Sequence, residues 1–490
     1  MPLQAPVRPA GPIGHAVRSS GHGRTPARQP HRGIALALIL VASFMVVLDF
    51  SIVNVALPAI ERELGLTVAS VQWVVTGYAI TFGGFLILGG RAADLFGRRR
   101  MFIAGLTIFA LASLAGGLAA DPVLLVASRF VQGAGAALVA PAALSLITTG
   151  FAEGNERTRA LGLYGATASI GFVAGQVFGG LLVQYTTWHS VFLVNVPIGL
   201  LAAALAPVLL PSGGERRSAR RLDIGGAVTI TAAVAALVYA VSQAPARGWT
   251  SLVVLSALAA AAVAGAAFVL VERRHADPLL RPGLLRLPSL RSAGTASLLM
   301  GAWSAGEMLV LSLYFQQVLR VSPLMTGLAI APQGVVGFVA AAYGSRMTRR
   351  IGVRGVLMLT SVIAVIGFAI LTQLPATGGY SALLLAVTLV GFGTSGVAFG
   401  TVVLASGGIP DSDQGVVGGI VSTSRQVGAA IGAALLPAIA EAVSHVSGSA
   451  GVGGDRAAML AGAVGASLAV VVAVRAPRTG QPVRVAVVTE

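Results

Sequence analysis

The chain is built from apolar segments of about 20 residues, which recur from Ile34 almost to Arg475. A helix needs about 20 apolar residues to cross a bilayer. Only 10% of the 490 residues are charged and 56% are hydrophobic, whereas soluble chains carry about 25% charged residues. A water-soluble core cannot accommodate this imbalance, so the sequence predicts an all-α integral membrane protein.

Charged residues, prolines and glycine clusters bound these apolar runs and predict fourteen spans. The spans are 34–59, 71–93, 101–119, 123–149, 160–183, 190–210, 224–242, 251–271, 292–315, 325–345, 355–374, 381–405, 414–440 and 457–474. The two longest basic connectors, 211–223 and 272–291, separate them into groups of six, two and six. Repeated six-helix units are expected of a transporter whose substrate site lies between two halves.

The predicted division of the chain follows from these groups. It consists of a disordered tail at 1–33, a six-helix bundle at 34–210, a linker with two extra helices at 211–291, a second six-helix bundle at 292–474 and a tail at 475–490. The extra helices carry few residues with chemistry of their own, so we expect them to pack or to face lipid.

The placement of arginines predicts the orientation, because loops on the cytoplasmic side of a membrane accumulate basic residues. All 33 basic residues are arginines, and 27 of them lie in the N-terminal tail, the even-numbered loops and the C-terminal tail. Four lie on the other side, and two lie inside spans. We therefore expect a multi-pass protein of the cell membrane with both termini in the cytoplasm.

Missing residue types exclude several function classes. Cysteine is absent, which excludes disulfides and Cys-ligated metals, and the lack of lysine excludes the phosphate-binding loop of ATPases. The six histidines are scattered without metal-ligand spacing, and no polar cluster points to an enzyme. Membrane topology explains the net charge of +16, so we expect no nucleic acid and no cofactor.

A glycine- and arginine-rich loop, GRAADLFGRRR, lies between spans 2 and 3. Glycines at both ends allow tight turns, an Asp can cap a helix, and arginines anchor at lipid headgroups. The loop resembles the signature of the major facilitator superfamily, in which it implies a latch between neighbouring spans in one conformation. The residues of this predicted latch are Gly90, Asp94, Gly97, Arg98 and Arg99.

Three further stretches resemble the fourteen-helix drug:proton antiporter branch of that family. They are LDFSIVNVALPAI (48–60), RFVQGAGAALVAPA (129–142) and WHSVFLVNVPIG (188–199). The resemblance implies a monomeric carrier that exports small amphiphilic, cationic drugs or antibiotics by alternating access, with protons as the coupling ion and lipid around it. Two alternatives stay open: a proton-coupled carrier of one metabolite or peptide, and a membrane sensor or scaffold that transports nothing.

The fifth span departs from the antiporter signature, which has Gly-Pro followed by a Gly pair. Small residues that permit close helix packing are present, but Gln176 stands where proline is expected. The sequence therefore does not predict the helix bend that proline would impose at this position. The residues of this motif are Gly171, Gly175, Gln176, Gly179 and Gly180.

Charged residues inside spans are the candidate functional residues, because each costs about 2.5–3.5 kcal/mol at a helix centre. At 1.5 Å per residue, Asp49 lies about 22 Å from the cytoplasmic end of its span and Arg129 roughly 9 Å below the outer surface. These depths permit an ion pair. Its separation during transport would favour protonation of Asp49, so we assign the pair to proton coupling; a purely structural ion pair is the alternative.

Two more charged residues lie in the second half of the chain. Glu307 occupies the place in span 9 that Asp49 has in span 1, and it is a candidate proton carrier or counter-charge for a cationic drug. Arg425 falls near the middle of span 13, where it would pair with Glu307, meet an anionic substrate group or hold the helix in place. Gln132, one turn from Arg129, completes the predicted substrate cavity with these two residues.

Overall fold

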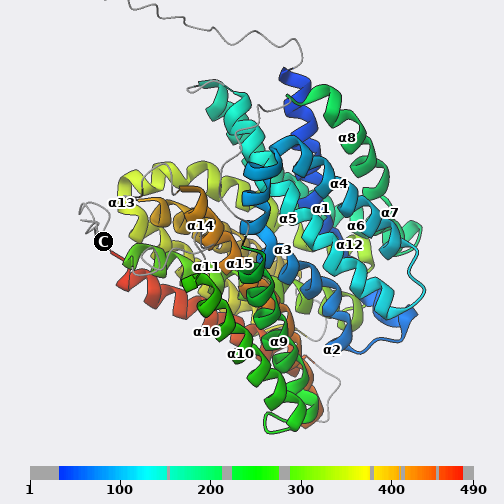
Figure 1. The fold of residues 1–490 in the computed structure, drawn as a ribbon. Coiled ribbons are helices and arrows are strands. Elements are labelled where there is room, and N and C mark those ends of the chain that lie inside the picture. Colours follow the sequence, from blue (N-terminus) through cyan, green and yellow to red (C-terminus); the bar gives the residue numbers. More distant parts are fainter. Residues whose placement is uncertain are drawn as a thin grey trace, which may run out of the picture.

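The computed structural model describes residues 32–151, 155–211, 223–274, 287–375, 380–407, 409, 414–447 and 452–477, and all regular secondary structure in these ranges is helical. Figure 1 shows a first group of helices, from blue α1 to green α8, beside a second group that runs from yellow-green to red, with the inserted pair α9 and α10 in green. The helices of the first bundle are α1 (Arg32–Leu64), α2 (Val68–Val71), α3 (Trp73–Phe96), α4 (Arg98–Gly117), α5 (Pro122–Gly150), α6 (Asn155–Tyr185), α7 (Ser190–Leu193) and α8 (Asn195–Leu209). The remaining helices are α9 (Ile224–Arg247), α10 (Leu252–Arg274), α11 (Pro288–Leu313) with a π-helical end η2 (Tyr314–Val318), α12 (Pro323–Ile330), α13 (Pro332–Leu371), α14 (Tyr380–Ser406), α15 (Gln414–Ser447) and α16 (Gly453–Arg475).

The helices correspond to the predicted spans. Within the described ranges, thirteen helical stretches are long and apolar enough to cross a membrane, and α3 has a shorter apolar stretch, Trp73–Leu86. α12 and the beginning of α13 form span 325–345. The rest of α13 forms span 355–374, because Gly352 interrupts the helix with a φ of 72° that favours glycine. The all-α membrane fold is confirmed.

The loop between α3 and α4 corrects two details of the prediction. Gly97 makes the sharp turn with a φ of 96°, but Gly90 lies inside α3 beside Pro141 and turns nothing. Asp94 is also inside α3, and the N-cap of α4 is Gly97, which has no side chain to accept a hydrogen bond. Both helices extend further toward each other than expected, so the turn is confined to one residue.

The inserted hairpin lies against the seam between the bundles. α9 packs on α10, on α3 of the first bundle and on α15 of the second. Its buried contact with them is an apolar cluster that consists of Ala79, Ile80, Val234, Val238, Ala430 and Ala434. α10 packs on α9, and exposed apolar residues such as Leu252 and Val263 line its outer face. α9 therefore packs against both bundles, whereas the outer face of α10 is suited to contact with lipid.

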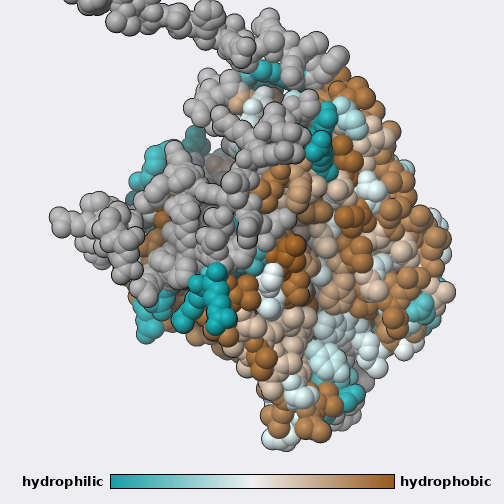
Figure 2. Space-filling view, viewed as in Figure 1, coloured by the Kyte–Doolittle hydropathy of each residue, from teal (hydrophilic) through white to brown (hydrophobic). Residues whose placement is uncertain are grey.

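The outer surface of the protein is apolar. Figure 2 shows apolar side chains over the flank where α8 lies, and Leu201 and Val208 of that helix expose 61% and 80% of their surface. Exposed large apolar side chains are unfavourable in water over so wide an area. They are expected where lipid surrounds the helices.

The bundles join at one end of the molecule, which we call the far side; the terminal side is the end where α1 begins. Three side chains of the second bundle donate hydrogen bonds to the last part of α1: Ser312 to the Asn54 oxygen (2.6 Å), Gln316 to the Val55 oxygen (2.9 Å) and Gln317 to the Glu61 carboxylate (2.7 Å). The far side of the molecule is thus closed.

Candidate functional site

Asp49 and Arg129 form an ion pair inside the first bundle. Arg129 Nη1 lies 2.7 Å from Asp49 Oδ2, and the two side chains expose 1% and 0% of their surface. Arg129 also donates to the Val74 oxygen (2.7 Å) and to Gln132 Oε1 (2.6 Å). Both Nε and Nη1 of this buried arginine are therefore hydrogen-bonded, which offsets part of the cost of burying its charge.

The start of α5 sets the position of Arg129. Asp121 caps the helix by accepting from the Val123 and Leu124 amides, and Pro122 occupies the first turn, where its missing N–H costs nothing. Arg129 follows two turns later. Gln132 is three residues further and shares its face of the helix, so both side chains point at α1.

Two residues that sequence reasoning missed complete the site. Asn195 Nδ2 donates to Asp49 Oδ1 (2.8 Å) and to Ser113 Oγ (3.2 Å), and Gln132 Nε2 donates to the same two atoms at 2.8 and 2.7 Å. Asn195 lies within the stretch 188–199, where it is one of several polar residues and carries no charge that would single it out. Ser113 gives no signal beyond a hydroxyl in an apolar span.

Aromatic rings cover the guanidinium of Arg129. Its Cζ lies 4.5 Å from the ring centre of Tyr78 and 5.7 Å from that of Phe192. Such cation–π contacts stabilise a desolvated cation. Together with Asp49 and the amides, they stabilise a charged pair in the buried interior of the bundle.

Glu307 lies in a separate site in the second bundle. It is 1% exposed, and its Oε1 accepts a 2.7 Å hydrogen bond from Gln333 Nε2. Its helix is fixed nearby by Trp303, whose indole N–H donates to Thr394 Oγ1 at 2.9 Å. Within the described ranges, no hydrogen bond or ion pair links Glu307 to Arg425, so the structure does not bring this predicted pair together.

The glycines of α6 bring this helix close to α1 and α12. Gly175 and Gly179 lie against the main chain of α1 at Leu48 and Ile52, and Gly180 lies against Leu324 of α12. Gly171 contacts α1 one turn earlier. A side chain at any of these positions would keep the helices apart, as the small-residue motif predicts.

Gln176 is fully buried where the two bundles meet. Its Nε2 donates to the Ser51 oxygen of α1 (3.3 Å) and contacts the Met308 sulfur of α11 (3.8 Å), whereas its Oε1 is buried without a partner among the described residues. α6 continues as one helix through this position. Glutamine therefore keeps the main-chain N–H that proline would remove.

One residue of the predicted latch, Arg99, contacts the end of α8. Arg99 Nη1 donates to the Pro207 and Leu210 oxygens at the end of α8, at 3.1 and 3.2 Å. A cation at these unsatisfied carbonyls stabilises the helix end. Arg98 lies at the start of α4, and the side chain of Asp94 lies outside the described part.

Arg425 differs from Arg129 in its surroundings. It lies in mid-span on α15 and is exposed. In the described structure it has no hydrogen bond from its side chain and no ion pair, and its electrostatic partner is the Tyr164 hydroxyl of α6. Neighbouring residues attach α15 to α3, since Thr423 Oγ1 donates to the Gly83 oxygen at 3.1 Å.

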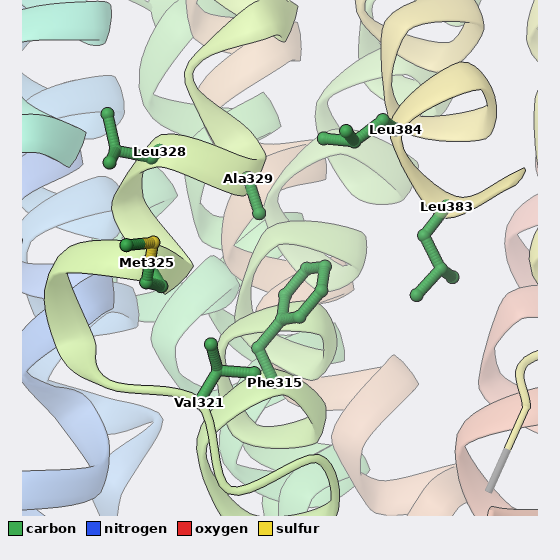
Figure 3. A pocket seen from close by; sticks show the side chains of 7 residues that line it. All are labelled: Phe315, Val321, Met325, Leu328, Ala329, Leu383 and Leu384. Carbon is green, nitrogen blue, oxygen red and sulfur yellow. The ribbon is translucent and has the colours of Figure 1, made fainter. Parts of the chain in front are cut away.

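A separate apolar pocket of about 450 Å³ lies among η2, α12 and α14. Figure 3 shows the side chains around it, and none carries a polar group. Its lining residues are Phe315, Val321, Met325, Leu328, Ala329, Leu383 and Leu384. It contains none of the predicted site residues and offers no group for proton transfer.

No group of three or more metal-ligating side chains is found within the described ranges. Asp49 instead accepts from three side chains, whereas Asn195 Oδ1 and the Tyr78 hydroxyl are buried without a hydrogen-bond partner among the described residues. Such an arrangement favours the ionised form of a carboxylate, and movement of the donors away from it favours uptake of a proton.

Comparison with known proteins supports a carrier. The pattern of the Major Facilitator Superfamily matches residues 39–433. The chain is 39% identical over 409 residues to the cephamycin export protein CmcT of Amycolatopsis lactamdurans, covering 82% of this chain and 84% of that protein. It is 40% identical over 414 residues to the puromycin resistance protein pur8 of Streptomyces alboniger, covering 83% and 81%.

Solved structures share the fold. A bacterial homologue of the human lysosomal transporter Spinster, in an inward-facing and occupied conformation, superposes with a TM-score of 0.67 over 92% of this chain and 98% of that chain, at 16% identity. The transporter PepTSo of the POT family gives 0.65 over 90% and 96%, at 15% identity. The arrangement of helices is thus found in solved transporters.

Proposed function

The chain belongs to the major facilitator superfamily, and from this premise we propose that it exports small amphiphilic drugs or antibiotics in exchange for protons. The family resemblance read from the motifs is confirmed. Relatives named for drug export or resistance support the substrate class, and carriers of this family are not enzymes. We also propose that protons move in the opposite direction to the drug and that the drug is a cation.

The observation that carries proton coupling is the buried Asp49–Arg129 pair. An ionised carboxylate with 0% exposure is stable only while its donors stay in place. These donors come from α5 and α8, whereas Asp49 is on α1. A movement of these helices in the transport cycle separates the charges and favours protonation, which couples the conformation to a proton. Glu307 has a matching place in the second bundle and is proposed as a second carrier or a counter-charge.

Export is supported by the relatives named for it, and the proposed orientation assigns this conformation a place in the export cycle. The arginine distribution supports an orientation with both termini in the cytoplasm, in which the closed far side faces outward and the conformation described loads drug from inside. The Gly90–Arg100 loop then lies at the cytoplasmic surface, where it is proposed to latch the opposite conformation. The proposed unit is a monomer in the cell membrane.

The test is ethidium uptake into inverted membrane vesicles, with and without a protonophore. We expect uptake driven by the proton gradient that is lost in Asp49→Asn. Asp121→Asn is the matched control, because Asn caps α5 as well as Asp does and the same charge is removed. Gradient-driven uptake retained by Asp49→Asn would contradict the coupling role.

A further inference from the structure

The two arginines inside spans, Arg129 and Arg425, have different environments. Arg129 is 1% exposed and paired with Asp49. Arg425 lies 11 residues into α15, about 16 Å along the helix, and is exposed without a hydrogen bond or ion pair from its side chain in the described ranges. An unpaired charge in a span is unfavourable, so it calls for a partner that the described residues do not provide.

Arg425 faces the space between the bundles. Its own main-chain oxygen packs on Gly301 of α11, and Gln426 packs on Gly83 of α3, so α15 lies against both helices at this level while the Arg425 side chain stays exposed. The group that interacts electrostatically with the guanidinium is the Tyr164 hydroxyl, which belongs to α6 of the first bundle. The arginine and the tyrosine thus face each other from opposite bundles.

Open space adjoins both residues on the terminal side. A Cβ at Gly165, next to Tyr164, would meet no atom within 4 Å. The same holds for Gly418, which lies seven residues, or two helical turns, before Arg425 on the same face of α15. The far side is closed by contacts such as Ser312 to Asn54, so this space opens toward the terminal side.

The charge presented to this space is positive. Asp49 and Glu307, the two acidic residues at the centres of spans 1 and 9, are 0% and 1% exposed and already hydrogen-bonded. A guanidinium has five N–H donors in a planar fork that matches a carboxylate, and the pair is strong where water is scarce. The Tyr164 hydroxyl, which donates a long 3.4 Å hydrogen bond to the Ala140 oxygen in this conformation, can turn to donate to the same anion.

We propose that Arg425, with Tyr164, binds the carboxylate of an amphiphilic substrate in the space between the bundles. This rests on the proposed export function and narrows its substrate class: the site selects drugs with an anionic group, whether or not they also carry a positive one. Cationic compounds without such a group bind through their apolar part alone.

The test uses two dyes that share one aromatic body: rhodamine 19, which carries a free carboxylate, and rhodamine 6G, its ethyl ester. Binding to the purified full-length protein in nanodiscs is measured by fluorescence anisotropy. We expect tighter binding of rhodamine 19, a loss of at least tenfold in Arg425→Gln with less than twofold change for rhodamine 6G, and partial recovery in Arg425→Lys. Arg274→Gln, at the exposed end of α10, is the matched control and keeps the preference.

Equal weakening of both dyes in Arg425→Gln would show a purely structural arginine and overturn the proposal. An unchanged preference, or no binding of rhodamine 19 to the unsubstituted protein, would overturn it as well. Gradient-driven rhodamine 6G flux in proteoliposomes is measured in parallel. Flux without a carboxylate preference contradicts this inference alone, whereas Arg425-dependent binding without flux contradicts the export function alone.

Discussion

The main-chain oxygen of Gln176 in α6 lies directly against Gly327 in α12, so close that a Cβ at position 327 would overlap it. The two helices belong to different bundles, and their contact forms part of the closed far side. Close approach of backbones is possible only where one residue has no side chain. Gly327 is therefore a condition for this conformation rather than for the fold of either bundle.

Gly327→Ala is expected to shift the protein away from the conformation closed on the far side. The chain has no cysteine, so Gly418→Cys, which adjoins open space on the terminal side, provides a single labelling site. We expect maleimide labelling of this cysteine to slow several-fold when Gly327→Ala is added. Gly265→Ala, where a Cβ meets nothing within 4 Å, serves as the control. Labelling at an unchanged rate would show that the contact does not favour this conformation.

Asn195 is expected to stabilise the ionised Asp49. Removing its 2.8 Å hydrogen bond in Asn195→Ala leaves a buried acceptor and should cost about 1–3 kcal/mol, seen as a lower midpoint of thermal unfolding. Asn195→Asp places a like charge beside Asp49 and should cost more than the alanine variant. The order of the unfolding midpoints tests this: the wild type should be highest, Asn195→Ala lower and Asn195→Asp lowest. An Asn195→Asp variant as stable as the wild type would mean that Asp49 is not ionised here.

The spans and the Asp49–Arg129 pair could be predicted from the sequence for the same physical reason. Crossing lipid requires long apolar helices, and a charge inside one of them stands out and needs a partner. Helix rise alone places these two residues at compatible depths. The neutral members of the network, Asn195 and Ser113, carry no charge and so gave no comparable signal.

Other features depend on packing between distant segments, which patterns in a single sequence do not reveal. The exposure of Arg425 and its position opposite Tyr164 arise from how two bundles meet. The role of Gly90 was misjudged because a glycine permits a turn without requiring one, and here α3 continues through it. That α9 would pack on both α3 and α15 could not be read from its uniformly apolar composition.

Gln176 is expected to be replaceable by an apolar side chain of similar shape. Its Oε1 has no partner in the described structure and its 3.3 Å hydrogen bond to the Ser51 oxygen is long, so the amide contributes little. Gln176→Met should unfold at the same temperature as the wild type or a few degrees higher. Gln176→Pro removes a main-chain donor inside α6 and should unfold several degrees lower, at a cost of about 3 kcal/mol. Equal stability of the proline variant would indicate that α6 accommodates the family's bend.

The packing of α9 on the first bundle depends on Gly84 of α3, because a Cβ there would overlap Thr231 Oγ1 of α9. Gly84→Ala should therefore lower thermal stability by about 1–3 kcal/mol, as overpacking does. Adding Thr231→Ala removes the clashing oxygen and should restore at least half of the loss, which a double-mutant cycle of unfolding midpoints measures. Purely additive effects of the two substitutions would mean that α9 does not pack here, and that the inserted hairpin lies elsewhere in the membrane.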